Sequence, residues 1–433
     1  MRFEKTVLQL ALDFISLDRA LKVAEEAVKG GVDWIEAGTP LIKSEGLEAV
    51  RRVKKNFPRH IILADMKTVD TGSIEVEIAA KAGADVVILL GTADDTTVRE
   101  AVEAGRRLGS RVMIDLLGMK NPAARAVELE RLGVDYVCVH VGIDQQMQGM
   151  DPLKILSQVV EVVHVPVAVA GGINSEMAAS AVETGASIVV VGGAITKAED
   201  AEVAAAAIKK AMANRKPLPT KRYKKYRETD LSRVFMEVST PNVSDALQRK
   251  GDMRGVKPVV GGVKAVGRAI TVRTYPGDWA KPIEAIDIAG SQSVIVIDAG
   301  GGREAVWGEL ATWSCIKRKV AGVVIDGGIR DIDAIRELKF PAFARHMNPT
   351  AGDPKGLGEI NVEVTCGGVK VRPGDWIVGD DTGVVVVPGE VAVEVANRAK
   401  DVLEKEVRIR EEIKRGSTLS KVLQLKRWEK VFG

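Results

Sequence analysis

Short apolar runs rich in β-branched residues alternate with longer stretches of helical periodicity over the first 212 residues. The apolar runs begin at Val7, Asp33, His60, Ala84, Arg111, Asp135, Val165 and Ser187. Between them, apolar residues recur at spacings of three and four, and glycine often stands at the C-terminal stop, which is typical of amphipathic helices. Eight such units, with strands apolar on both faces, predict an α/β fold of the (β/α)8 TIM-barrel type over residues 1–212. No GxGxxG opens the first helix, which argues against an open dinucleotide-binding sheet.

The pattern changes after this region. The segment NRKPLPTKRYKKYRET is basic and poor in aliphatic residues, so we expect an exposed linker over residues 213–235. A solvated spacer is favoured there over contact with nucleic acid or an acidic partner surface. Residues 236–433 then carry β-rich runs, a hairpin-like segment and a charged helix from about Glu390 to Lys414. Because helices and strands no longer alternate regularly, we predict a second α/β domain that is not another barrel.

Composition limits the class of protein. A chain of 433 residues suits two or three domains, and 46% apolar residues are enough for full cores, which excludes global disorder. The 62 basic and 59 acidic side chains nearly balance, so composition gives no reason to expect nucleic acid as the main partner.

Cysteine usage and hydropathy bear on the compartment. The three cysteines are far apart in sequence and form neither a disulfide framework nor a CxxC metal motif. No apolar stretch reaches the ~18 residues of a membrane span, and the N-terminal residues lack the pattern of a secretory signal. We therefore expect a cytoplasmic protein with no membrane partner.

Polar residues that follow the predicted barrel strands are the candidates for an active site, because barrel enzymes place their chemistry at the C-terminal strand ends. These candidates are Asp13, Glu36, Asp65, Lys67, Asp70, Asp115, His140 and the glycine pairs Gly171–Gly172 and Gly192–Gly193. Any one of them could be a solvated loop residue, but their convergence from several strands favours a site.

Each residue type has a chemical use. Glu36 and Asp65 end neighbouring strands and could hold one hard divalent cation, Mg²⁺ or another such as Mn²⁺. Lys67 follows Asp65 by two residues, so on an extended strand both side chains point the same way, and the ammonium would stabilise an enediolate. His140 could transfer protons near neutral pH. The glycine pairs suit a phosphate cradle of backbone N–H groups, the alternative being ordinary tight turns.

The strings LQLALD, WIEAGTPLIKSEG, ADMKTVDTG and AVAGGIN resemble the 3-hexulose-6-phosphate synthases of the orotidine-monophosphate decarboxylase superfamily. The most specific motif is DxKxxD at Asp65, Lys67 and Asp70. The resemblance implies that Glu36 and Asp65 bind Mg²⁺, that Lys67 stabilises the enediolate, and that Asp70 reaches across a dimer interface into the partner's site. Orotidine decarboxylases share DxKxxD but lack the glutamate after the second strand, so Glu36 disfavours that activity.

Three cavity positions bear on the substrate. The related 3-keto-L-gulonate-6-phosphate decarboxylases carry Glu, Arg and Thr where this chain has Asp115, Ile143 and Ala170. The three residues of this chain resemble those of the synthases. Ile143 departs mildly from the valine expected in a synthase. The implied reaction is the reversible aldol addition of formaldehyde to D-ribulose 5-phosphate, with Asp13 and His140 among the catalytic residues. A decarboxylase-type barrel is the alternative.

The second half has one informative arrangement of charges. Arg330 and Asp331 stand together after an apolar strand, and Glu309 precedes Arg330 by 21 positions. A guanidinium beside a carboxylate suits a 2-oxo acid, with Arg330 on its carboxylate and Asp331 holding a divalent metal through waters. Glycine before Glu309 would leave backbone N–H groups for an anion. A surface ion pair is the alternative.

Residues 236–420 resemble the RraA-like family, which includes class II 4-hydroxy-4-methyl-2-oxoglutarate aldolases and the regulator of RNase E. The carrying motifs are the [DE]-x20-R-D pattern, TPNVSDAL, TVRTYPGD and FPAFAR, although His346 stands where many relatives have glycine. The resemblance implies that Arg330 binds pyruvyl groups, Asp331 anchors Mg²⁺, and Glu309 supports the site, in trimers or hexamers.

Two functions stay open for this half, a metal-dependent 2-oxo acid lyase and a non-catalytic module that binds an RNase. A chain that acts only as a scaffold is the weakest hypothesis. With a barrel dimer and a C-terminal trimer or hexamer, we expect a homo-oligomer.

Overall fold

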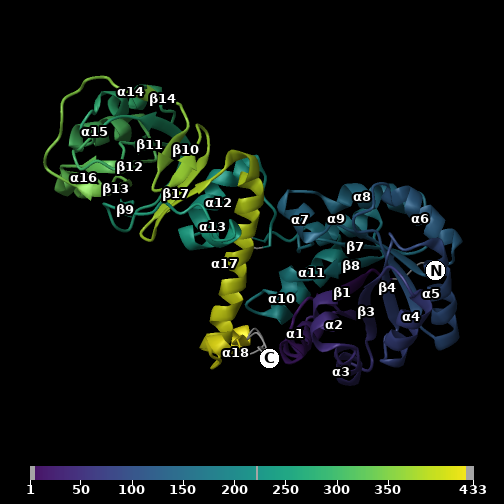
Figure 1. Ribbon diagram of the computed structural model, residues 1–433. Helices are drawn as coiled ribbons and strands as arrows, with labels where there is room; N and C mark the ends of the chain where they lie inside the picture. The colour runs from purple at the N-terminus through teal and green to yellow at the C-terminus, as the bar shows by residue number, and fades with distance from the viewer. Residues whose placement is uncertain (1–4, 221–222, 426–433) are drawn as a thin grey trace, which may run out of the picture. The chain divides into compact units, whose positions relative to one another are not determined.

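The computed structural model describes residues 5–220 and 223–425 (Figure 1). The chain divides into two compact units. The first comprises Met1–Lys225 together with Glu404–Gly433, and the second comprises Tyr226–Leu403.

Eight parallel strands of the first unit form a closed barrel in the order β1 to β8, with β1 paired to β8. They are β1 (Val7–Leu12), β2 (Trp34–Ala37), β3 (Ile61–Thr68), β4 (Val86–Leu90), β5 (Arg111–Asp115), β6 (Tyr136–His140), β7 (Val167–Ala170) and β8 (Ile188–Val191). Each predicted apolar run contains one of these strands, so the TIM-barrel prediction is confirmed.

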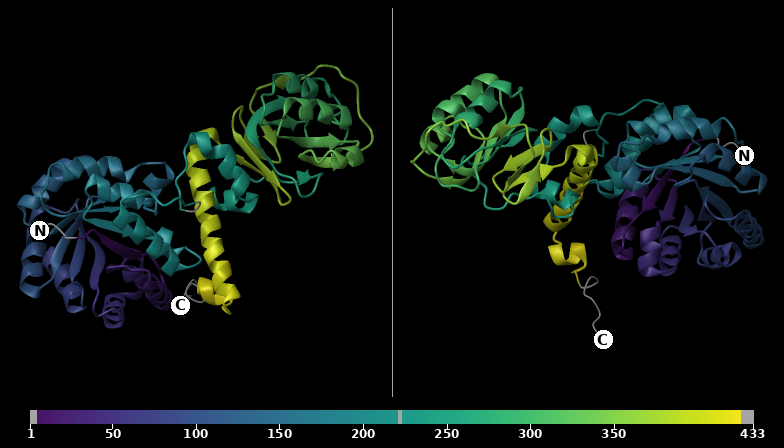
Figure 2. Two further views of the ribbon diagram at one scale, coloured as in Figure 1. Left: turned by 180° about the vertical axis from the view of Figure 1, so that it is seen from behind. Right: turned by 45° about the horizontal axis from the view of Figure 1, so that its top comes forward.

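Helices surround the barrel on its outside, as the views of Figure 2 show. They are α1 (Leu17–Lys29), α2 (Thr39–Glu45), α3 (Glu48–Asn56), α4 (Gly72–Lys81), α5 (Asp95–Leu108), α6 (Pro122–Arg131), α7 (Ile143–Met147), α8 (Pro152–Val160), α9 (Met177–Thr184), α10 (Gly193–Thr196) and α11 (Ala201–Asn214). In α1 the Ser16 hydroxyl caps the first turn by accepting the Arg19 N–H, and the alanines Ala20, Ala24 and Ala27 face the strands.

The inside of the barrel is packed with side chains. Trp34 and Tyr136 meet edge to face there, with ring centroids 5.6 Å apart, alongside small and branched residues such as Ala168 and Ile188. A second apolar cluster lies between the strands and the helices. Because both strand faces are buried, the polar residues of the strands stand out as exceptions that need a function or a partner.

The second unit is built on an open mixed sheet in the order β18–β17–β10–β11–β12–β13–β9, with β14 beside β10. Its strands are β9 (Lys257–Pro258), β10 (Ala265–Arg273), β11 (Ser293–Asp298), β12 (Gly322–Ile329), β13 (Ala342–Met347), β14 (Glu359–Ile360), β17 (Trp376–Asp380) and β18 (Gly383–Val387), and a separate hairpin joins β15 (Val364–Cys366) to β16 (Val369–Val371). Its helical segments are η1 (Glu228–Asp230), α12 (Leu231–Glu237), α13 (Thr240–Ala246), α14 (Ala280–Ile288), α15 (Glu309–Arg318), α16 (Ile332–Glu337) and η2 (Gly389–Val391). This unit is not a second barrel.

One expectation for this half is corrected. Strands β10 to β13 are parallel, and α14, α15 and α16 connect them, so helices do alternate with strands here. Long irregular connections between these elements hide the alternation in the sequence. The helices pack on one face of the sheet, where Ile286 and Cys315 contact the Ile325 side, and the β15–β16 hairpin packs on the other. These three layers confirm the α/β/β architecture.

The boundaries between the units differ from those expected at two places. The segment from Tyr226 onward, including η1 and α12, is folded into the second unit, where Leu231 and Phe235 are buried, so the expected linker over 213–235 is shorter. The charged helix α17 (Ala392–Lys414) begins in the second unit, but its last residues and α18 (Leu419–Leu423) belong to the first. Their polar side chains pair with barrel residues, a long-range contact with no signal in the local pattern.

Two further expectations can be compared with the described ranges. No helix in residues 5–220 or 223–425 has the length and apolar character that crossing a membrane requires. Cys138, Cys315 and Cys366 are all free and buried.

Candidate active site

A network of charged side chains joins three strands at the C-terminal end of the barrel. The Lys67 Nζ donates to both carboxylate oxygens of Asp65, at 2.8 and 2.7 Å, and to Asp115 Oδ2 at 2.7 Å. The same Asp115 oxygen lies 2.8 Å from His140 Nδ1. Residues from β3, β5 and β6 are thereby connected through one ammonium group.

The backbone at the end of β3 is irregular. Lys67 has a φ of 54°, in the left-handed region, and the pairing register with β4 shifts between Asp65 and Thr68. The expectation that simple strand alternation aims Asp65 and Lys67 together is therefore wrong in its reason, because a bulge does so. A non-glycine residue held in this region is strained, and such strain is found at functional sites.

Two polar partners inside the barrel were not singled out from the sequence. Gln9, fully buried in β1, donates from Nε2 to Glu36 Oε2 at 2.5 Å. The Thr39 hydroxyl donates to Asp65 Oδ2 at 2.8 Å. Gln9 had a signal, since it is a lone amide in the otherwise apolar run VLQLAL; Thr39 had none beyond its place after β2.

Negative charge accumulates on one side of this network. Burial raises the pKa of Glu36, which is only 6% exposed, well above its usual value, and the charges of Asp65 and Asp13 raise it further. The pKa of Asp13 is also raised, by the loss of surrounding water and then by Asp65, although solvent still reaches its side chain from the open end of the barrel. These carboxyl groups would ionise more readily beside a bound cation.

Positive charge lies beside Asp115, at the other end of the network. Burial alone would raise the pKa of Asp115, but hydrogen bonding to His140 and the nearby charges of His140 and Lys67 lower it to about 2. Burial alone would lower the pKa of Lys67, but Asp65 and Asp115 more than offset this and raise it. At neutral pH, Asp115 is therefore a carboxylate and Lys67 an ammonium.

The carboxylates fit a divalent cation that keeps some of its own ligands. In the described residues, no three His, Cys, Asp or Glu side chains gather into a closed metal centre. Glu36 and Asp65 offer hard oxygen donors, and Mg²⁺ commonly takes one or two carboxylates and completes its shell with water and substrate oxygens. Burial is the main cause of the raised pKa of Glu36, and Asp65 and Asp13 add negative charge beside it that a cation would neutralise.

The two glycine pairs lie after β7 and β8. The first leaves little room for a side chain, whereas a Cβ in the second would make only ordinary van der Waals contacts. Gly171 has a φ of 108°, and a Cβ there would lie 2.4 Å from the Val141 carbonyl oxygen. A Cβ on Gly192 would lie 3.6 Å from Asp13 Oδ2, and one on Gly193 3.4 Å from the Lys197 Cε. Lys197 was not among the sequence candidates, although a lysine four residues after Gly193 suits an anion-binding loop.

Three other candidates lie outside the charged network. Asp70 is exposed and accepts the backbone N–H of Thr71 at 2.7 Å. Ile143, the first residue of α7, is 63% exposed. Ala170 ends β7 and is buried, next to Gly171 and Gly172, whose φ of 72° is also positive.

In the second unit, Asp331 and Arg330 follow β12 directly and meet the start of α15. Asp331 Oδ2 accepts the Glu309 N–H at 3.1 Å and lies 3.6 Å from Arg330 Nε. The Glu309 side chain accepts the Trp313 indole N–H at 3.2 Å. The Glu309 N–H is thus already paired with Asp331, which corrects the expectation that this backbone group faces an anion.

Comparison with known proteins assigns the two halves to different families. A family model described as orotidine 5′-phosphate decarboxylase / HUMPS family matches residues 6–208, and one described as Aldolase/RraA matches residues 240–386.

Two curated relatives match the barrel half. The 3-hexulose-6-phosphate synthase of Mycobacterium gastri is 42% identical over 206 residues, which cover 48% of this chain and 99% of that protein. The enzyme of the same name from Bacillus subtilis (strain 168) is 38% identical over 194 residues, covering 45% of this chain and 92% of that protein. The solved structure of the RNA-processing inhibitor RraA from Thermus thermophilis is 27% identical, covers 38% of this chain and 94% of that one, and has a TM-score of 0.31.

Proposed function

Because the chain belongs to the orotidine 5′-phosphate decarboxylase / HUMPS family through residues 6–208 and carries an Aldolase/RraA domain over residues 240–386, we propose that its barrel is a 3-hexulose-6-phosphate synthase. The reaction is the addition of formaldehyde to D-ribulose 5-phosphate to give D-arabino-hex-3-ulose 6-phosphate, and its reverse. The observation that carries this proposal is the Asp65–Lys67–Asp115–His140 network at the end of the barrel where such enzymes act.

His140 is proposed to move the proton. Because Asp115 is a carboxylate at neutral pH and lies 2.8 Å from Nδ1, that nitrogen carries a hydrogen and donates it. When Nδ1 carries the only hydrogen of the ring, Nε2 can accept the proton from C1 of ribulose 5-phosphate. The electron pair released from the C1–H bond makes the enediolate, whose C1 forms the new bond to the formaldehyde carbon, and the resulting alkoxide takes up a proton.

Lys67 is proposed to stabilise the enediolate. Its ammonium is held between Asp65 and Asp115 and stays charged, so it presents a fixed positive group to the oxygen that gains charge. Such a fixed group acts without reorganisation during the reaction, and a comparable donor contributes about 3–4 kcal/mol.

Glu36 and Asp65 are proposed to hold Mg²⁺ or another divalent cation such as Mn²⁺. When bound, the cation would withdraw electron density from the substrate's carbonyl oxygen and make the C1 proton more acidic. Gln9 orients the Glu36 carboxylate, and Thr39 orients that of Asp65, so both are held before substrate arrives.

The substrate phosphate is proposed to lie against the glycine pairs after β7 and β8. These loops are where TIM barrels commonly bind phosphate. At Gly171 the left-handed φ and the neighbouring Val141 carbonyl allow only glycine, which brings the backbone itself to the cavity. Lys197, beside Gly193, would supply a cation.

One assay tests the barrel proposal. The full chain is incubated with ribulose 5-phosphate and formaldehyde, with and without EDTA, and formaldehyde consumption is followed. Metal-dependent consumption is expected. The alternative, a 3-keto-L-gulonate-6-phosphate decarboxylase, predicts instead release of CO₂ from that substrate and no use of formaldehyde; Ile143, in place of the decarboxylases' arginine, favours the synthase.

Asp70 is proposed to act in the site of a partner subunit. It is exposed and stands outside the network of its own chain. Mixing Asp70→Asn with Lys67→Met chains, each inactive alone, should restore part of the activity through mixed dimers that contain one intact site. Mixtures that stay inactive, although mass photometry shows mixed dimers, would contradict this role.

The second unit is proposed to bind a 2-oxo acid through Arg330, with Asp331 anchoring a divalent metal. The contact of Asp331 with the start of α15 fixes its carboxylate beside the guanidinium. Metal-dependent oxaloacetate decarboxylation by the full chain should disappear in Arg330→Ala and persist in Lys67→Met. Inactivity towards 2-oxo acids together with direct binding of an RNase would favour the regulatory alternative.

A further inference from the structure

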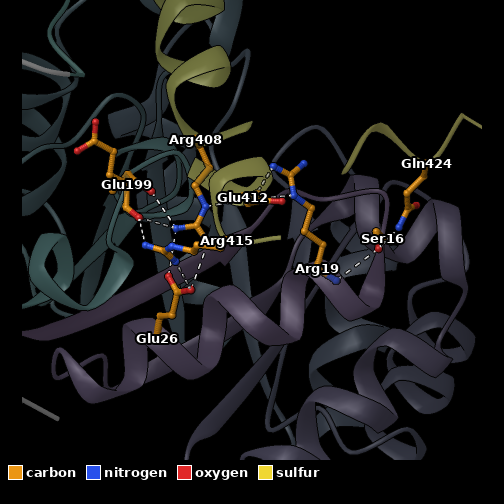
Figure 3. A network of polar contacts seen from close by, with 9 residues as sticks. Ser16, Arg19, Glu26, Glu199, Arg408, Glu412, Arg415 and Gln424 are labelled. Atoms are coloured by element: carbon orange, nitrogen blue, oxygen red, sulfur yellow. Dashed lines mark hydrogen bonds and ion pairs between the residues drawn. The ribbon is translucent and has the colours of Figure 1, made fainter. Parts of the chain in front are cut away.

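Two chain segments outside the barrel's strands and helices hold the loops that follow β7 and β8. One is the segment that leaves the barrel after α11, in its described residues 218–220 and 223. The other is the C-terminal part of the first unit, from Glu404 to Gln424. We call them the leaving segment and the returning segment. Figure 3 shows the polar contacts of the returning segment.

Arg408 of the returning segment fastens the backbone after the second glycine pair. Its Nη1 donates to the carbonyl oxygens of Ala198 at 3.0 Å and Glu199 at 3.2 Å. The same guanidinium pairs with Glu26 of α1, at 3.1 and 3.3 Å, and with Glu412 through Nε at 3.1 Å. Each nitrogen of the group thus has an acceptor.

The Arg408 guanidinium is buried within the first unit. The Arg408 side chain is only 2% exposed, and a buried charge of this kind is retained only with a full set of partners. Arg415 adds a donor to the Glu199 carbonyl at 2.8 Å, and Arg19 of α1 pairs with Glu412 at 2.9 Å. Two guanidinium groups of the returning segment therefore hold the loop by charge-assisted hydrogen bonds.

The connection from these carbonyls to the glycines is short. Ala198 N donates to Ile195 O, and Lys197 N donates to Gly193 O, both at turn or helical spacing. A shift of the Ala198 and Glu199 carbonyls would therefore be transmitted through one turn of α10 to Gly193 and to the Lys197 side chain beside it.

The leaving segment holds the other glycine loop in a similar way. The Ser175 hydroxyl donates to the Leu218 carbonyl oxygen at 2.8 Å, and the Leu218 N–H donates to the Ser175 carbonyl oxygen at 3.2 Å. Thr220 N donates to Glu176 Oε1 at 2.9 Å. The two segments also contact each other, because Tyr223 N donates to Glu404 Oε1 at 2.6 Å.

We propose that Arg408 is a positioning residue for phosphate binding, and that the returning segment sets the conformation of the loop after β8 from outside the barrel. The inference rests on the proposed sugar-phosphate substrate. Arg408 does not touch the substrate; it acts through the Ala198 and Glu199 carbonyls. The barrel of residues 1–212 alone would then have all the proposed catalytic side chains but a poorly ordered phosphate loop.

Steady-state kinetics of the full chain test this role. Arg408→Lys keeps the charge but cannot reproduce the forked donors. We expect it to raise the KM for ribulose 5-phosphate and the inhibition constant of inorganic phosphate about tenfold, because small displacements of binding groups have large effects. The kcat should stay near that of the wild type. Turnover of unphosphorylated ribulose, which makes no phosphate contact, should be unchanged.

A matched control is Arg410→Ala, since Arg410 is an exposed arginine of the same helix. This variant should keep the wild-type KM, phosphate inhibition constant, kcat and turnover of unphosphorylated ribulose. If Arg408→Lys does not fold, as judged by thermal melting, Arg415→Ala replaces it, because that side chain is 42% exposed and also donates to Glu199 O. Equal losses towards the phosphorylated and unphosphorylated sugars, or an unchanged KM in the folded variant, would overturn the inference. A wild type that consumes no formaldehyde would instead defeat the proposed function.

Discussion

Lys67 Nζ lies 2.7 Å from Asp115 Oδ2, although the two residues are 48 positions apart and belong to different strands. The same ammonium also contacts both oxygens of Asp65. One lysine therefore neutralises two buried carboxylates, and we expect its removal to affect both the proposed catalysis and the folded state.

Replacement of Lys67 should separate these two effects. We expect Lys67→Met to lower kcat/KM several-hundred-fold, since a fixed charge at a developing oxyanion contributes about 3–4 kcal/mol, and to lower the melting temperature because Asp65 and Asp115 lose their partner. Formaldehyde consumption and thermal melting measure the two. Lys54→Met is the control, because Lys54 pairs with Asp85 at the same 2.7 Å outside the network. Near-normal turnover in a folded Lys67→Met protein would refute the assignment.

Asp115 should make the barrel sensitive to acid. The pKa of Asp115 is lowered to about 2 from a usual 3.8, so its contribution is fully present above pH 4 and is lost as the pH falls towards 2. The contribution is about 2 kcal/mol. In urea unfolding, the free energy of unfolding of Asp115→Asn should therefore fall less between pH 4 and pH 2 than that of the wild type. Parallel acid profiles for the two proteins would contradict the depressed pKa.

Glu36 should have the opposite sign of effect on stability. Its pKa is raised by burial and by Asp65, so the ionised form is unfavourable in the folded protein without a cation. Glu36→Gln should raise the melting temperature in EDTA and remove activity. Added Mg²⁺ should stabilise the wild type, by about 2.7 kcal/mol at a hundred times Kd, and leave the variant unchanged. Equal stabilisation of both would place the cation elsewhere.

Gly171 should not tolerate a methyl group. Gly171→Ala combines the strain of a positive φ with a carbonyl oxygen 2.4 Å from the new Cβ. We therefore expect the free energy of unfolding to fall by at least about 2 kcal/mol. Phosphate binding should also be lost. Gly109→Ala is the matched control, because Gly109 also has a positive φ, of 76°, but nothing lies within 4 Å of its added Cβ. The free energy of unfolding of Gly109→Ala should fall by about 1 kcal/mol. Urea unfolding and phosphate inhibition compare the two.

The barrel and its polar strand ends could be predicted from the sequence because both depend on local order. Each strand and its following helix are adjacent in the chain, so the period of the apolar residues reports them directly. Glu36, Asp65, Asp115 and His140 were found because a barrel places every strand end at one face.

Contacts that depend on distant parts of the chain could not be predicted. The bulge that turns Lys67 towards Asp65 lies where β3 pairs with β4, a strand that follows later in the chain. Arg408 lies in the predicted charged helix, and nothing near it in the sequence marks Glu26 as its partner 382 positions earlier.

The discontinuity of the first unit has a consequence for biosynthesis. A ribosome makes residues 226–403 before it makes Arg408, so the barrel emerges and waits for the whole second unit before its last contacts can form. At about 5–20 residues per second, this interval lasts roughly 10–40 seconds. During that time, nascent Glu26 and the backbone after β8 lack the guanidinium that later covers them. Chains that stop early would therefore differ from finished ones in the part that was translated first.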